Sequence, residues 1–273
     1  MTGIQIDGKI IAGIGARPQL YIEPGATEGT AEELVKGLRE HAKGARLVSA
    51  CSWEKIPAFA AAGYRERCFG APVSPLILDL TKGADQLFRE FSETRRTRIR
   101  RAIRAKVSIE EMAAADFPKY YEIYRAWCGM KGVAVASYSR QEELMRDRSN
   151  RLVLVARHEG KIIAASIFRY RKGGMMEYAA NASRREDSKV HPNDLLFWEG
   201  MQRAISMGLR RFSGGGSHFF LQRFGGTVAP TYNYLLDLSL FRRYVVAEVI
   251  RGARTAVTRR MPPPIKAALK RLV

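Results

Sequence analysis

Residues 151–170, RLVLVARHEGKIIAASIFRY, decide the fold of this chain. Two runs rich in Val, Ile and Leu flank Gly160-Lys161, an arrangement typical of two antiparallel strands joined by a tight turn. A third run of the same kind, GMMEYAANA (174–182), follows directly. The sequence therefore predicts a three-stranded antiparallel meander.

The residues after the meander predict a helix and further strands. Asn193 or Asp194 can cap the helix start, and Gly208 can end it. A strand, LRRFSGG (209–215), resumes at once, and a short helix then leads to another strand, TYNYLLDL (231–238). Strands interrupted by one long helix in this order predict an α/β (α+β) fold with a mixed sheet flanked by helices.

A strongly basic segment lies upstream of the meander. Residues 94–106, TRRTRIRRAIRAK, contain seven cations and no acid. We expect a strand at Leu76–Leu80, then one long helix with an apolar stripe and a separate basic stripe, and a further helix after Asp116. The apolar stripe comprises Phe88, Phe91, Ile99, Ala102 and Ile103, and the basic stripe comprises Arg96, Arg100 and Arg104.

The same order of segments occurs twice. DGKIIAGIGA (7–16) and QLYIEPGA (19–26) precede AEELVKGLREHAKGARLVSA (31–50), much as EGKIIAASIF (159–168) and MMEYAANA (175–182) precede the later helix. A repeat of this length, with its segments in the same order, predicts duplication of a whole domain. The expected parts are a shortened N-terminal half at 1–75, a C-terminal half at 76–240 with the basic helix at the junction, and a basic amphipathic tail at 241–273.

Composition narrows the class of protein. The 273 residues are 46% hydrophobic, enough for packed cores, and carry a formal net charge of +19. This charge favours a polyanionic partner, and nucleic acid, anionic lipid headgroups and nucleotide-linked substrates would each satisfy it. Three cysteines without CxxC spacing argue against a zinc site, so no metal is expected. No signal peptide or long apolar run is recognised, which predicts a cytoplasmic protein.

The ordered segments carry a resemblance to a known family. The set comprises 76–111, 152–168, EYAANAS (177–183), the stretch 191–215 and FFLQRFGG (219–226). It resembles the Fem-type branch of the GNAT acyltransferase superfamily, which includes peptidoglycan-bridge aminoacyltransferases and their relatives in polysaccharide gene clusters. The resemblance implies tandem GNAT-like domains that transfer an acyl or aminoacyl group to an amine. Where that family commonly has a Phe-Lys pair, this chain has Phe220-Leu221.

Transfer to an amine needs a proton acceptor, an oriented donor carbonyl and polarisation of the developing oxyanion. Glu177 and Asp194 are the candidate proton acceptors, although Asp194 could instead cap its helix. His191 and His218 flank the region, and a surface or hydrogen-bonded role is the alternative to catalysis for both. The side chains expected to bind substrate are Tyr178, Asn181 and Ser213, together with Arg96, Arg100 and Arg104.

Glycines and arginines are the candidates for phosphate recognition. Gly214 and Gly215 would let the backbone approach a phosphate of a donor or substrate, with Arg223 close by. A plain turn is the alternative for the two glycines, since glycine chiefly indicates unusual backbone angles. The basic stripe is expected to line a cleft between the two halves that receives the phosphates of a substrate.

The leading hypothesis is an N-acyltransferase or aminoacyltransferase acting on an amine of a nucleotide- or lipid-linked cell-envelope or polysaccharide precursor. No tightly bound cofactor is expected, and the donor is either acyl-CoA or aminoacyl-tRNA. The alternatives are a nucleic-acid-binding (tRNA-binding) protein, for which no helix-turn-helix, zinc-finger or RNP-type signature is recognised, and a degenerate non-catalytic relative. The tail is expected to contact an anionic membrane at its inner face.

Overall fold

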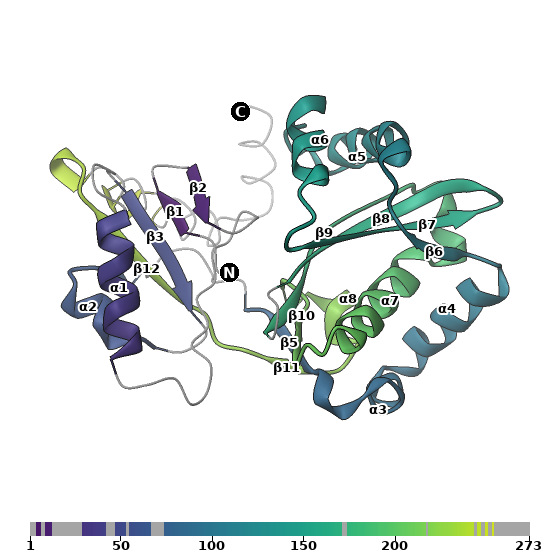
Figure 1. Cartoon of the computed structure of the whole chain (residues 1–273), viewed down its shortest axis with the longest axis horizontal. Coiled ribbons are helices and arrows are strands. Elements are labelled where there is room, and N and C mark those ends of the chain that lie inside the picture. The colour runs from purple at the N-terminus through teal and green to yellow at the C-terminus, as the bar shows by residue number, and fades with distance from the viewer. Residues whose placement is uncertain are drawn as a thin grey trace, which may run out of the picture. The chain divides into compact units, whose positions relative to one another are not determined.

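The chain forms two compact units in the computed structural model. One comprises Met1–Pro72 and Pro230–Val273, and the other comprises Val73–Ala229 (Figure 1). The structure describes residues 4–6, 9–12, 29–41, 47–52, 55–66, 74–170, 174–216, 218–242, 245–246, 249–250 and 253.

The first unit is built from both ends of the chain. Within its described residues a five-stranded sheet has the order β2-β1-β3-β12-β4. One side of α1 buries Val35 and Leu38, and Phe59 of α2 stacks on Tyr234 with ring centroids 4.2 Å apart. Its elements are β1 (Ile4–Ile6), β2 (Lys9–Ala12), α1 (Thr30–His41), β3 (Leu47–Ser52), α2 (Pro57–Ala61), β4 (Arg65–Glu66), β12 (Tyr232–Asp237) and the 3-10 turn η4 (Leu240–Arg242).

The strand at 231–238 lies in a different sheet from the one its sequence neighbours form. We predicted it as part of the C-terminal half, whereas β12 pairs antiparallel with β3, from Tyr232↔Ser52 to Asp237↔Leu47. The physical reason is burial, because Tyr234 and Leu236 are core residues of the first unit. The first-half run at 19–26 lies outside the described residues.

The second unit contains a seven-stranded mixed sheet, in the order β11-β5-β10-β9-β8-β7-β6 for the described residues. The predicted meander is confirmed, since β7, β8 and β9 pair antiparallel in succession. Its strands are β5 (Leu76–Asp79), β6 (Ser108–Glu111), β7 (Arg151–His158), β8 (Lys161–Tyr170), β9 (Met175–Ser183), β10 (Arg211–Ser213) and β11 (Thr227–Val228). Its helices are α3 (Ala84–Glu90), α4 (Glu93–Arg104), α5 (Phe117–Lys131), α6 (Tyr138–Arg146), α7 (Pro192–Ser206) and α8 (Phe219–Gln222), with 3-10 turns η1 (Leu80–Lys82), η2 (Ala114–Asp116) and η3 (Glu186–Val190).

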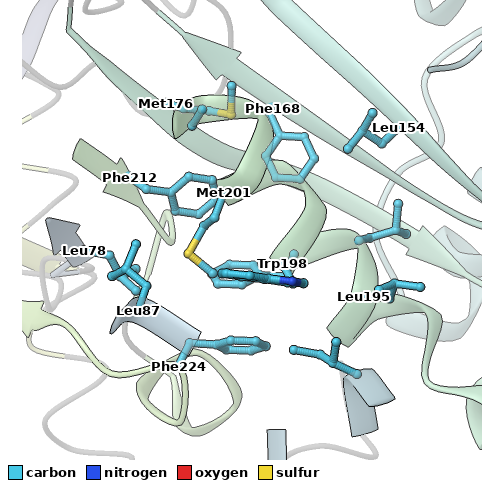
Figure 2. Close-up of a cluster of buried hydrophobic side chains, with 14 of the residues drawn as sticks. Leu78, Leu87, Leu154, Phe168, Met176, Leu195, Trp198, Met201, Phe212 and Phe224 are labelled. Atoms are coloured by element: carbon cyan, nitrogen blue, oxygen red, sulfur yellow. The ribbon is translucent and has the colours of Figure 1, made fainter. Parts of the chain in front are cut away.

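Helices cover both faces of this sheet. On one face α5 and α6 bury Phe117, Ile123 and Met145 against the strands, and on the other α7 lies on the sheet with α4 packed against it (Figure 1). The larger core lies on the α7 face, where aromatic rings and leucines converge from strands and helices (Figure 2). Gly200 lets α7 approach closely, because a Cβ at that position would lie 2.3 Å from the Phe168 ring.

Residues 84–104 form two helices, α3 and α4, instead of the one long helix we predicted, and the basic segment lies in α4. Phe91 and Ser92 are extended and separate α3 from α4, and the Ser92 N–H donates to the Arg223 carbonyl at 2.9 Å. Because of this break, α4 has its own orientation, and the residues on its buried face are Arg95, Ile99 and Ala102. Ile103, which we placed in the apolar stripe, is 56% exposed.

Most of the predicted basic tail at 241–273 lies outside the described residues. Among the helices of the described residues, none has the length and apolar character needed to cross a membrane.

Candidate functional site

The candidate site lies where strands β9 and β10 part. The two strands run parallel from Arg211↔Met175 to Ser213↔Glu177, and there the pairing stops. Beyond Glu177, β9 continues to Ser183 and, among the described residues, has only β8 as a strand partner. One edge of β9 therefore offers backbone N–H and C=O groups that a bound molecule can satisfy.

Two local features produce this parting. In the β8–β9 pairing, Ile167 faces Ala180 and Phe168 faces Tyr178, so Ala179 is an extra residue that bends β9. After β10 the chain turns at Gly215, which has φ +71° and approaches β9 so closely that a Cβ would lie 2.6 Å from the Tyr178 carbonyl oxygen. Only glycine suits both conditions.

On the α7 face of the sheet, polar side chains from β8, β9 and α7 form a network. Asn181 Nδ2 donates to Asn193 Oδ1 at 2.9 Å, and Asn193 Nδ2 donates to Ser183 Oγ at 3.1 Å. Tyr178 packs against Phe197 and hydrogen-bonds with Ser166. Burial raises the pKa of Tyr178 well above its usual range, so its hydroxyl stays protonated and can donate a hydrogen bond.

Asp194 lies in the same region but is already paired. Its Oδ1 accepts a hydrogen bond from Arg95 Nη1 at 2.6 Å, and both side chains are about 95% buried. The guanidinium of Arg95 also covers the Phe220 ring at 4.2 Å. The predicted helix cap is wrong, because α7 begins at Pro192 with His191 as its N-cap and no side-chain cap. Proline suits the first helical position because its fixed φ matches the helix.

On the opposite face, Glu177 is bonded to Arg169. Glu177 Oε2 and Arg169 Nη2 lie 2.8 Å apart, and both side chains remain partly exposed, at 18% and 15%. Ser213 points to this face too, but it is buried and its Oγ accepts from the Gly215 N–H at 3.1 Å. The predicted site residues thus form two groups, one on each face of the sheet, next to the parting of β9 and β10.

The predicted phosphate-binding glycines have hydrogen-bond partners. The Gly214 N–H donates to the Leu76 carbonyl at 2.8 Å, and the Gly215 N–H donates to Ser213. A phosphate would therefore have to displace existing bonds to reach these groups. Arg223 is half-buried, and its guanidinium lies over the Phe219 ring at 4.5 Å.

The arginines of the predicted basic stripe differ in their surroundings. Arg96 Nη1 donates to the carbonyls of Arg89 and Phe91, at 2.6 and 2.7 Å, and so holds the end of α3. Arg100 is exposed and lies 5.5 Å from the Phe88 ring centroid, and Arg104 is exposed. Of these three arginines, Arg100 and Arg104 are the exposed ones.

Both histidines near the site have a pKa below the usual value. For His191 the main cause is burial, and Arg98, Arg101 and Arg95 add to it while Asp194 opposes it. For His218 the causes are burial and then Lys131. Both side chains are therefore neutral near pH 7.

Sequence reasoning missed three residues of this site. Arg95 was one of seven cations within residues 94–106, and its partner Asp194 is 99 residues away in the sequence. Asn193 was considered only as a cap, and Arg169 was not considered. The buried face of α4 could have indicated Arg95 if the break at Ser92 had been recognised. Among the described residues, no group of three or more His, Cys, Asp or Glu side chains could hold a metal ion.

Comparisons with known proteins agree with this fold. Residues 91–223 match the family model of the acetyltransferase (GNAT) domain. No curated protein matches the chain. The solved structure of FemX is similar, with a TM-score of 0.67 over 87% of this chain and 85% of that one, at 12% identity.

Two further structures are similar over 87% of this chain and 83% of their own, each with a TM-score of 0.55. One is the C-terminal domain of an Agrobacterium fabrum protein assigned as a lysylphosphatidylglycerol synthetase, at 18% identity. The other is L-PGS from Bacillus licheniformis, at 16% identity. At such identities the likeness is one of fold.

Proposed function

We propose that this chain, an acyltransferase with a GNAT domain at residues 91–223, modifies an amine of a nucleotide- or lipid-linked cell-envelope or polysaccharide precursor. The observation that carries the proposal is the parting of β9 from β10 beside Glu177. An extended donor with amide groups can pair with the open edge of β9, as a further strand would. Its reactive carbonyl would then lie close to the Glu177 carboxylate.

The reaction requires few side chains. The acceptor nitrogen bonds to the acyl carbon, and the bond from that carbon to the donor's sulfur or oxygen breaks. The nitrogen loses a proton, and the released sulfur or oxygen takes one up and leaves as a thiol or a hydroxyl. Glu177 is the better placed of the two predicted acceptors for that proton, because it is partly exposed at the parting. Asp194 is almost fully buried on the other face and is bonded to Arg95, which favours a role in holding α7.

Neutral Tyr178 and Asn181 lie on the α7 face of β9, at and beyond the point where the strands part. Their role in this proposal is to orient the donor by hydrogen bonds, since positioning alone supplies much of the rate of such reactions. Tyr178 can donate because burial keeps its hydroxyl protonated.

The exposed arginines favour an anionic substrate. Arg100 and Arg104 are exposed on α4, in a chain of net charge +19. The name of the lysylphosphatidylglycerol synthetase indicates aminoacyl transfer to an anionic lipid by that protein. Phosphates of a nucleotide- or lipid-linked acceptor would suit the same arginines here, and so would a tRNA donor.

A transfer assay with paired donors tests this function. Purified protein is incubated with labelled aminoacyl-tRNAs or with acetyl-CoA, and with an amine-bearing nucleotide-linked or lipid-linked muropeptide. We expect label in the acceptor with one donor class, and a loss of about 100-fold in rate for Glu177→Gln. Glu199→Gln is the matched control, because it removes another ion-paired glutamate, bonded to Arg203 on α7.

The outcomes separate the alternatives. Equal rates for Glu177→Gln and the wild type would remove Glu177 from the reaction. No transfer with any donor, together with salt-sensitive binding of tRNA, would favour the nucleic-acid-binding alternative. No transfer and no tRNA binding would favour a non-catalytic relative, in keeping with Phe220-Leu221.

A further inference from the structure

Three arginines lie together on the α5/α6 face of the second unit. Arg151 of β7 and Arg169 of β8 are directly paired residues of neighbouring strands, and Arg148 lies just before β7. Arg151 is 4% exposed, and burial lowers its pKa, with Arg169 and Arg148 adding to the effect. The positive charges of Arg169 and Arg148 therefore act on the Arg151 guanidinium.

Acidic side chains and backbone carbonyls pair with some of the N–H groups of these arginines. Arg169 is bonded to Glu177, and Arg151 Nη1 lies 3.9 Å from Asp147 Oδ2 and donates to the Leu144 carbonyl. Arg148 Nη2 donates to the Met112 carbonyl at 3.0 Å. The cluster is thus fixed in place by its surroundings.

Two donors of the cluster remain unused. Arg169 Nε and Arg148 Nη1 are buried and have no hydrogen-bond partner among the described residues. Buried N–H groups without an acceptor are rare in folded proteins, because an unsatisfied buried donor loses its hydrogen bonds to water, and a charged donor loses more. A planar carboxylate accepts from the forked donors of a guanidinium in a geometry that suits both groups.

Arg169 of the cluster is paired with Glu177, and this pairing indicates what kind of molecule would carry the bound carboxylate. A molecule with an amine and a carboxylate on neighbouring atoms can place its ammonium group against Glu177 and its carboxylate against the arginines. It would bring opposite charges to both members of the Glu177–Arg169 pair. The same amine would then lie at the point where β9 and β10 part.

We propose that the cluster of Arg148, Arg151 and Arg169 binds the carboxylate of the acceptor, so that the amine which receives the acyl group belongs to an amino-acid-type centre. This inference rests on the proposed transferase function and specifies its acceptor. The ligand chemistry is a carboxylate, and a phosphate is the competing anion to be separated by experiment.

Thermal melting of the full chain with small probes tests the site directly. Alanine, alaninamide and inorganic phosphate are compared at equal millimolar concentration, because a ligand of the folded state raises the melting temperature. We expect a shift with alanine and none with alaninamide, which has the amine but no carboxylate. Arg148→Gln and Arg148→Lys should weaken alanine binding at least about tenfold, since both lose the forked donors.

Arg157→Gln is the matched control. Arg157 lies on β7 as well and is bonded to Glu110 and Asp116, at 2.9 and 2.6 Å, away from the cluster. This variant should lose stability and keep the alanine shift. A shift with phosphate but not alanine, equal shifts with alanine and alaninamide, no shift at all, or an undiminished alanine shift in both Arg148 variants would overturn the proposal.

The test is independent of the transferase assay. Binding of alanine that depends on Arg148, in a chain that transfers nothing, would support the carboxylate site and count against the transferase. Transfer to amines with and without a neighbouring carboxylate at equal rates would support the transferase and overturn the carboxylate site.

Discussion

Arg95 and Asp194 form an ion pair inside the second unit, with Nη1 and Oδ1 2.6 Å apart and side chains only 4% and 5% exposed. The pair joins α4 to the first turn of α7, and the Arg95 guanidinium also lies over Phe220 and Phe224. A contact between residues 99 positions apart thus connects three helices.

Asp194→Ala should lower the free energy of unfolding by about 3–5 kcal/mol, because it leaves the Arg95 charge buried without a partner. The double variant Arg95→Met/Asp194→Leu should lose less, since it removes both charges. Urea denaturation followed by circular dichroism measures both. Glu199→Gln, which breaks the more exposed pair with Arg203, should cost no more than about 1 kcal/mol. A similar small loss for Asp194→Ala would contradict the structural role of the pair.

Gly215→Ala should both destabilise the second unit and reduce donor binding. The added Cβ would meet the Tyr178 carbonyl, and φ +71° is unfavourable for alanine, so the loss should exceed about 1 kcal/mol. Gly160→Ala is the control, because φ is +73° but no atom lies within 4 Å of its Cβ. Calorimetric melting of the two variants separates backbone strain from the clash. Equal losses would show that the close approach to β9 has no energetic effect.

We expect the arginines of α4 to have two different roles, one in stability and one in substrate binding. Arg96→Gln should cost about 1–3 kcal/mol of stability, because it loses charged hydrogen bonds to two carbonyls. Arg100→Gln/Arg104→Gln should leave the melting temperature nearly unchanged and weaken binding of a nucleotide sugar or lipid diphosphate, by about 1 kcal/mol or more per bond lost. If that double variant loses only salt-sensitive affinity for RNA, the predicted role in binding substrate phosphates is wrong.

Stability should fall on acidification below about pH 6.5, in part through His191. Its pKa in the folded chain is below the ordinary 6.5, so the unfolded chain binds the proton more readily. The contribution of neutral His191 to stability is complete above the pKa that this residue has in the unfolded chain. It is lost as the pH falls through the lower pKa that His191 has in the folded chain. His191→Asn, which suits φ 53°, should make the pH profile of unfolding free energy shallower between pH 7 and 5. An unchanged slope would exclude His191 from this effect.

Local patterns were sufficient to predict much of the second unit. Alternation and turn residues predicted β7, β8 and β9, and the apolar positions with Gly208 predicted α7, because neighbouring residues determine these elements. The resemblance to Fem-type proteins, inferred from the order of the segments, agrees with the fold likeness to FemX. Glu177 and Tyr178 lie on the predicted third strand, which in the structure parts from β10.

Contacts between distant residues could not be predicted in this way. The sequence pattern does not tell which of the six arginines on α4 faces inward, because Asp194 becomes a neighbour of Arg95 only after folding. The strand that pairs with β12 could not be predicted either, because the composition of TYNYLLDL (231–238) suits a strand of the first sheet as well as one of the second. The extra residue at Ala179 depends on the pairing of β8 with β9, which a single strand does not reveal.

The pairing of β12 with β3 affects the order in which this chain can fold during synthesis. Residues 47–52 leave the ribosome early, but their partner at 232–237 follows only after the whole second unit has been made. The second unit is continuous from Val73 to Ala229 and can fold while translation proceeds, whereas the first sheet must wait with an open edge. A nascent chain that has emerged from the ribosome as far as residue 230 would therefore carry a folded second unit and an incomplete first one. We expect chaperone binding to concentrate on this intermediate.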